Sequence, residues 1–165
     1  MVLTTIVLWI HIFGAIGWLG AAMVFGMVIG PSLPKLSPQA RAELLIKIIP
    51  RFARYIVVFA VLTLAFGVIT ATVILNGDFS VSLSTPFGLY ISIGAALALV
   101  VAVIALGVVL PTISKIVKMT ESLAKSPGPP PPELIAASNR LRMGSLVALV
   151  FLILVTMFMV AGATL

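Results

Sequence analysis

The sequence predicts an all-α membrane protein, a polytopic bundle of four transmembrane helices. Of its 165 residues, 62% are hydrophobic and only 8% are charged, whereas soluble domains carry about 25% charged residues. The mean hydropathy is +1.32. Four stretches without Lys, Arg, Asp or Glu are long enough to cross a bilayer as helices, which takes about 20 residues. They are Thr4 to Ile29, Tyr55 to Leu75, Phe87 to Leu110 and Met143 to Ala163.

These stretches are expected to be helices because open strands cannot satisfy their backbone hydrogen bonds in lipid. They leave no room for a sizeable soluble domain, so residues 1–165 form a single domain. The chain has no cysteine, which excludes disulfides, thiolate metal sites and cysteine nucleophiles. It also shows no Ser/His/Asp set, phosphate loop or zinc spacing, so a hydrolase or phosphotransferase is not expected.

The first stretch contains His11, the one histidine of the chain. An ionisable side chain inside a span is costly unless it is partnered, and it marks a candidate functional site. Two interpretations stay open: a cofactor or metal ligand, and a neutral imidazole that bonds the backbone of a neighbouring helix. Trp18 lies seven residues further on and hence on the same face. It is either a wall of the His11 pocket or bulky core packing.

The connection 31–54 begins its helical part at Ser37 and Pro38, a typical N-cap followed by proline at the first position. Pro50 is expected to kink the helix that leads into the second span. In the connection 111–142, Ile113 and Ile116 share an apolar face, which predicts an amphipathic helix lying on the membrane surface. The proline run 129–132 then favours a stiff spacer.

All ten Lys and Arg residues lie in the connections 31–54 and 111–142, and none lies at the termini or in the middle loop. Positive residues favour the cytoplasmic side, so both termini are predicted outside. The net charge of +6 is attributed to orientation and to anionic lipid headgroups, and nucleic acid is not expected as a partner.

A heme-sized slot is predicted near the outer side. His11 lies about 10 Å below the outer boundary at 1.5 Å per residue, and Gly67, Gly94 and Met157 can be counted to the same layer. Together with Gly14, these glycines would leave space for a flat macrocycle. The alternative is close helix packing, which also uses small residues. Met157 or Met159 is the candidate second axial ligand; they lie about 200° apart on a helix, so at most one faces the slot.

Copper is the alternative cofactor. Met23 and Met27 lie one turn apart on the first span, and thioethers suit Cu(I). Both lie well away from His11.

Three segments carry a resemblance to the copper-resistance D (CopD) membrane superfamily. They are His11-Ile12 with Ala15, Trp18 and Gly20; Arg51-Phe52 and Arg54 before Gly67; and Thr85-Pro86-Phe87-Gly88. The spacing from His11 to Trp18 is also similar to HemJ-type protoporphyrinogen oxidases, which hold heme b through a first-span histidine. The resemblance implies His11 as the axial ligand of the heme iron. The third-span lysine of that family is missing from Leu89 to Gly94, which disfavours protoporphyrinogen oxidation.

The leading functional expectation is a multi-pass protein of the cell membrane that binds heme b at His11 and serves electron transfer or a related redox step. The alternatives are a copper-handling membrane protein and a cofactor-free subunit or scaffold of a larger membrane complex. The expected partners are the lipid bilayer, a redox partner that the sequence does not identify, and a second copy or a larger complex.

Overall fold

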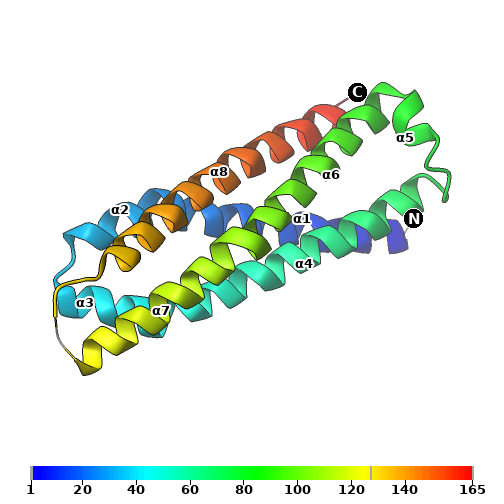
Figure 1. The fold of residues 1–165 in the computed structure, drawn as a ribbon. Helices are drawn as coiled ribbons and strands as arrows, with labels where there is room; N and C mark the ends of the chain where they lie inside the picture. Colours follow the sequence, from blue (N-terminus) through cyan, green and yellow to red (C-terminus); the bar gives the residue numbers. More distant parts are fainter. Residues whose placement is uncertain (1, 127, 165) are drawn as a thin grey trace.

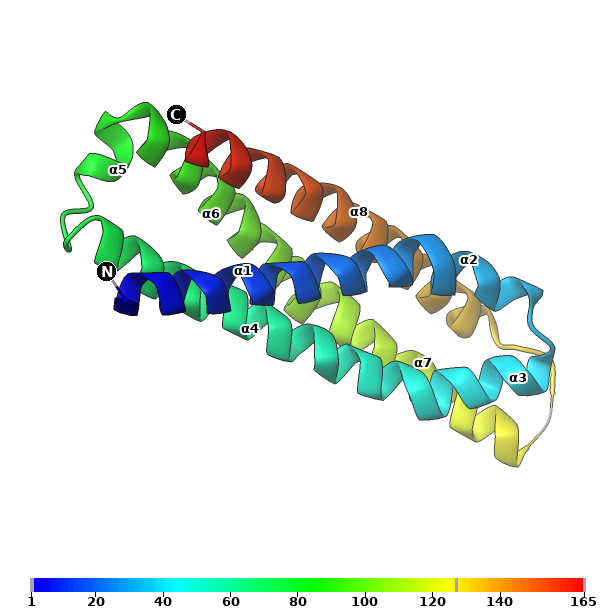
Figure 2. The same ribbon diagram turned by 180° about the vertical axis from the view of Figure 1, so that it is seen from behind.

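The computed structural model describes residues 2–126 and 128–164, apart from the side chain of Val81. This part of the chain is helical and contains no strand. Its long helices lie side by side with alternating direction (Figures 1 and 2). The predicted all-α four-helix class is therefore confirmed. The helices long and apolar enough to cross a membrane are Val2–Lys35, Pro38–Ile74, Pro86–Lys125 and Pro132–Ala163.

Three of the long helices are built from shorter segments in direct succession. The first comprises α1 (Val2–Met23), η1 (Val24–Ile29), α2 (Gly30–Ser32) and η2 (Leu33–Lys35). The second comprises α3 (Pro38–Glu43), η3 (Leu44–Ile48) and α4 (Ile49–Ile74). The third, which follows the short α5 (Val81–Ser84), comprises α6 (Pro86–Ile104), η4 (Ala105–Val109) and α7 (Leu110–Lys125). The fourth is α8 (Pro132–Ala163) without interruption.

The helices are much longer than a bilayer requires. They contain 34, 37, 40 and 32 residues, or about 50–60 Å at 1.5 Å per residue, whereas the hydrocarbon core is about 30 Å thick. The extra length covers most of the connections 31–54 and 111–142, which are largely helical. The predicted cap is present: the Ser37 hydroxyl accepts a hydrogen bond from the Ala40 backbone N–H at 3.3 Å.

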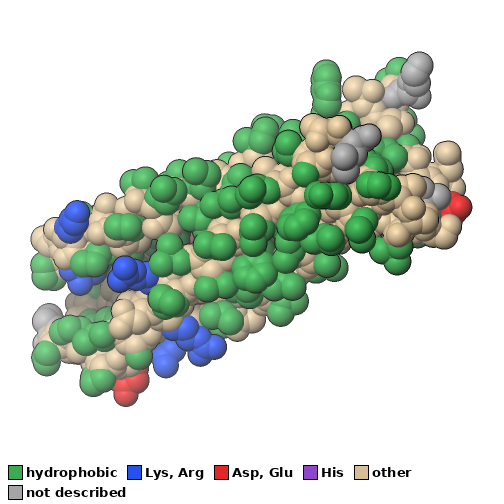
Figure 3. All heavy atoms as spheres, turned by 90° about the horizontal axis from the view of Figure 1, so that it is seen from above, with side chains coloured by type: hydrophobic (Ala, Val, Ile, Leu, Met, Phe, Trp, Pro, Cys, Tyr) green, Lys and Arg blue, Asp and Glu red, His purple; other side chains and the backbone are tan. Residues whose placement is uncertain are grey.

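Every Lys and Arg lies within residues 35–54 or 115–142, towards one end of the bundle that we call the basic end. Figure 3 shows the blue Lys and Arg side chains that gather there on one face. Here the structure corrects the expectation for α7. Its side chains Ile113 and Ile116 are only 7% and 2% exposed, because they pack between the second and fourth long helices. The apolar face of α7 thus completes a core beyond the predicted spans instead of lying free for a membrane surface. That core consists of Phe25, Leu45, Ile49, Ala53, Ile113, Ile116, Ala137 and Leu141.

Three π-helical turns interrupt the long helices, and each ends two residues before a proline. They are η1 before Pro31, η3 before Pro50 and η4 before Pro111. Proline lacks an N–H, and its ring clashes with the carbonyl four residues earlier. A π turn accommodates the ring because hydrogen bonds there reach back five residues, as from Gly30 N–H to Phe25 O. At Pro50, where the sequence predicts a kink, the structure has the π turn η3.

The opposite end of the bundle carries a tight turn after α4. Asn76 and Gly77 have φ angles of 49° and 78°, and Gly77 N–H donates to Thr72 O at 3.0 Å. Further on, Ser80 donates from its hydroxyl and its backbone N–H to the Asp78 carboxylate at 2.6 and 3.0 Å. These hydrogen bonds lower the pKa of Asp78 because they favour its charged form.

Candidate functional site

The centre of the candidate site is His11, a half-buried side chain on α1 that faces α4. Its Nδ1 lies 2.8 Å from the backbone oxygen of Thr63. A carbonyl oxygen can only accept, so Nδ1 carries the hydrogen and donates it. In the neutral ring Nε2 then keeps its lone pair. This arrangement fixes one tautomer and leaves Nε2 as the nitrogen that can ligate.

Gly67 on α4 makes room for the imidazole. A Cβ atom at this position would lie 3.0 Å from His11 Cε1 and 3.2 Å from Nδ1, closer than nine in ten real Cβ contacts. The predicted proximity of His11 and Gly67 is therefore found. The volume left by the missing side chain is filled by His11 itself.

Gly14 and Gly17 bring α1 close to α4 around the histidine. A Cβ at Gly14 would lie 2.9 Å from both the backbone N and Oγ1 of Thr63, and one at Gly17 would overlap the Phe59 ring. The Thr63 hydroxyl is itself occupied, since it donates to Phe59 O at 2.7 Å. These glycines serve close helix packing, the alternative that the sequence left open.

Thr63 is the site residue that sequence reasoning missed. It lies four residues before Gly67 and so shares its helix face, and it is 7% exposed. A threonine one helical turn from a predicted site glycine was the available signal in the sequence. Its main contribution, a backbone oxygen, cannot be read from residue type.

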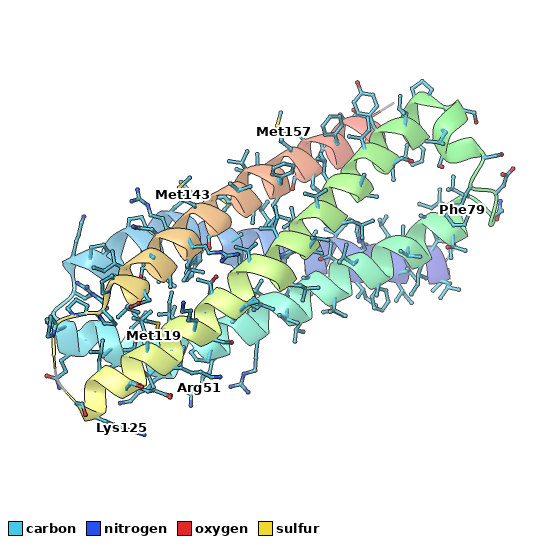
Figure 4. All side chains as sticks on the ribbon, in the orientation of Figure 1. Arg51, Phe79, Met119, Lys125, Met143 and Met157 are labelled. Atoms are coloured by element: carbon cyan, nitrogen blue, oxygen red, sulfur yellow. The ribbon has the colours of Figure 1, made fainter. Side chains whose placement is uncertain are left out.

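The remaining predicted site residues lie apart from His11. Gly94 on α6 makes room for Met159 of α8, whose Cε would be 3.0 Å from a Cβ at that position. Trp18 is 3% exposed and packs with Val101, Ala148 and Leu152, as the core alternative predicted. Met157 is 62% exposed and points outward from α8 (Figure 4).

A cavity of about 50 Å³ lies between the four long helices on the basic side of Trp18. Its lining includes Trp18, Phe25, Ile49, Val101, Ser145 and Leu152, and most of it is apolar. Pockets that hold cofactors or drug-sized ligands measure about 300–1,000 Å³. The cavity is thus too small for a macrocycle, and His11 does not line it.

Charged and metal-binding groups are sparse around the site. Within residues 2–126 and 128–164 there is no group of three or more His, Cys, Asp or Glu side chains that could hold a metal ion. The copper candidates Met23 and Met27 are 41% and 64% exposed. They therefore face the surroundings of the bundle more than its interior.

No family model, curated protein or solved structure matches this chain.

Proposed function

We propose that this protein binds heme b through His11 and carries electrons within the membrane. The observation that supports the proposal is the hydrogen bond from His11 Nδ1 to Thr63 O at 2.8 Å. Histidines that ligate metals characteristically donate their second ring N–H to a carbonyl or carboxylate, which fixes the ring and leaves the other nitrogen for the metal. The resemblance of the His11 to Trp18 segment to CopD-like and HemJ-type proteins points to the same residue.

His11 offers a nitrogen atom that can bind heme iron, but the space around it between the helices is filled. His11 Nε2 is available, but the volumes beside Gly14, Gly67 and Gly94 are filled by Thr63, His11 and Met159. The missing side chains thus leave no closed slot between the helices, and His11 is the residue that would hold a heme. Met157 would lie outside a slot between the helices, because it is 62% exposed and points outward from α8. A bound heme iron supplies a one-electron redox couple.

A second candidate is a cofactor-free subunit or scaffold of a larger membrane complex. The observation that favours it is the same filling of the glycine sites, since a histidine that packs on Gly67 and bonds Thr63 O already satisfies one ring nitrogen. Copper handling ranks third, because Met23 and Met27 are exposed on the first long helix and the described residues contain no group of three or more His, Cys, Asp or Glu side chains that could hold a metal ion.

Absorbance spectra separate these candidates. The wild-type protein, expressed with ample heme and purified in detergent, should show a Soret band, and His11→Ala should lose it. Gly67→Ala should also lower heme occupancy, because the added methyl would push the imidazole from its position. Gly20→Ala is the matched control, since a Cβ there meets nothing within 4 Å, and its heme content should equal that of the wild type.

A colourless wild-type protein would overturn the heme proposal. Stoichiometric copper by elemental analysis would then favour the copper candidate, and its absence would favour the scaffold. Full heme occupancy in His11→Ala would assign the iron to a different ligand.

A further inference from the structure

A second candidate binding site lies at the basic end, in a depression of about 20 Å³ between the first and fourth long helices. Gly26 brings α8 close, since a Cβ there would lie 3.2 Å from Leu149 Cδ2. At Gly30 a Cβ would meet only the carbonyl oxygen of Phe25 in its own helix, so the side towards α8 is open. The lining includes Gly26, Gly30 and Pro31 from one helix and Arg142, Ser145 and Leu146 from the other.

Arg142 brings an unneutralised positive charge to this depression. It is exposed, and within the described parts of the chain it has neither an ion pair nor a hydrogen bond. Lys47 pairs with Glu43 at 3.8 Å and Arg51 donates to Lys47 O at 3.3 Å, whereas Arg140, like Arg142, has no such partner among the described residues. What distinguishes Arg142 is that it lines the depression. Arg142 also directly precedes Met143, where the charge-free stretch of α8 begins. It therefore lies at the level where headgroups meet hydrocarbon.

Ser145 adds a polar atom without a partner. Its Oγ is buried and makes no hydrogen bond, although an unsatisfied buried polar group is destabilising. Ser145 lines both this depression and the cavity between the four long helices. Ser145 is three residues from Arg142, so both lie on the same face of α8. It lies about 4.5 Å deeper at 1.5 Å per residue. A glycerophospholipid has the matching order of groups, with a phosphate at the surface and ester carbonyls just below it.

We propose that this depression binds an anionic phospholipid of the adjacent leaflet. Arg142 pairs with the lipid phosphate, the Ser145 hydroxyl donates to an ester carbonyl, and an acyl chain lies along Gly26 and Leu146. The negative headgroup is favoured because the basic end carries all ten cations of the chain and only Glu43, Glu121 and Glu133 as acids. Basic clusters next to transmembrane helices characteristically recognise anionic lipids. This site is independent of heme at His11.

Native mass spectrometry of the full chain in neutral detergent, with added phosphatidylglycerol or phosphatidylcholine, tests the proposal. The wild type should retain phosphatidylglycerol in preference to phosphatidylcholine. Arg142→Gln should lower its retention about fivefold, the effect of one cation near a membrane surface, and Arg142→Lys should keep part of it. Ser145→Ala should lower the retention of both lipids, because both carry the ester groups. Circular dichroism and thermal unfolding confirm that each variant is folded.

Arg140→Gln is the matched control, because it removes the same charge two residues away, about 200° around the helix, and Arg140 does not line the depression. If Arg140→Gln and Arg142→Gln lower the retention of phosphatidylglycerol equally, the lipid is held by the overall positive charge of the basic end, and the proposal is overturned. Unchanged retention in Arg142→Gln or Ser145→Ala would overturn the role of that residue. Displacement of the lipid by millimolar inorganic phosphate would assign the depression to a free anion.

Discussion

His11 and Gly67 form one packing unit, because the imidazole occupies the volume of the side chain that position 67 lacks. Gly67→Ala should therefore destabilise the wild type by about 1–3 kcal/mol through overpacking. In a His11→Ala background the same change should cost clearly less, since the ring that the methyl would strike is gone. Thermal unfolding of the single and double variants in detergent measures this coupling. Equal costs in both backgrounds would contradict the contact.

The residues of the candidate site differ in how far the sequence could place them. His11 is the one histidine in the chain and lies in an apolar span, so composition alone singles it out, and counting depth along the helices brings Gly67 to its level. The depth of a residue along its helix, however, does not tell in which direction its side chain points around the helix axis. Gly94, which counting assigns to the same level, makes room for Met159 of α8. Met157 and Met159 lie about 200° apart on their helix, so only one of them could face inward. In the structure it is Met159, which packs against Gly94.

The turn after α4 depends on residue type because two of its residues have positive φ angles. Gly77→Ala should destabilise the protein by about 1 kcal/mol, because φ at this position is 78° and a side chain in the left-handed region is strained. Asn76→Gly is the matched comparison, since φ there is 49° and glycine removes strain. It should leave the thermal unfolding midpoint unchanged or raised. A lower midpoint in Asn76→Gly than in Gly77→Ala would refute this account.

The long helices show where sequence patterns stop being sufficient. Runs of uncharged residues predict four long apolar helices, which the structure contains, and Ser37 with Pro38 predicts a helix start that it also contains. Periodicity also shows that Ile113 and Ile116 share a face. It cannot tell whether that face meets lipid headgroups or other helices, because both environments accept apolar side chains. In the structure this face packs against the other helices, so α7 extends the bundle.

For the molecule as a whole, the orientation in the membrane can be tested directly. The cations at one end predict that the basic end is cytoplasmic. Ser80→Cys and Ser126→Cys place single thiols at opposite ends of a chain without native cysteine, and both positions are exposed. A membrane-impermeant thiol reagent on intact cells should label position 80 only, and both after lysis. Labelling of position 126 alone in intact cells would reverse the orientation.

The three π turns before Pro31, Pro50 and Pro111 also affect where this chain can lose a residue without disturbing its packing. In an ordinary α-helix, gaining or losing one residue rotates everything beyond it by about 100° and so separates packed faces. A π turn holds one residue more than an α turn. Removing one residue from η4 together with Pro111→Ala would convert the turn to α-helix while keeping both flanking faces in place. Single-residue deletions can therefore be absorbed at these three turns, whereas the uninterrupted α8 offers no such position.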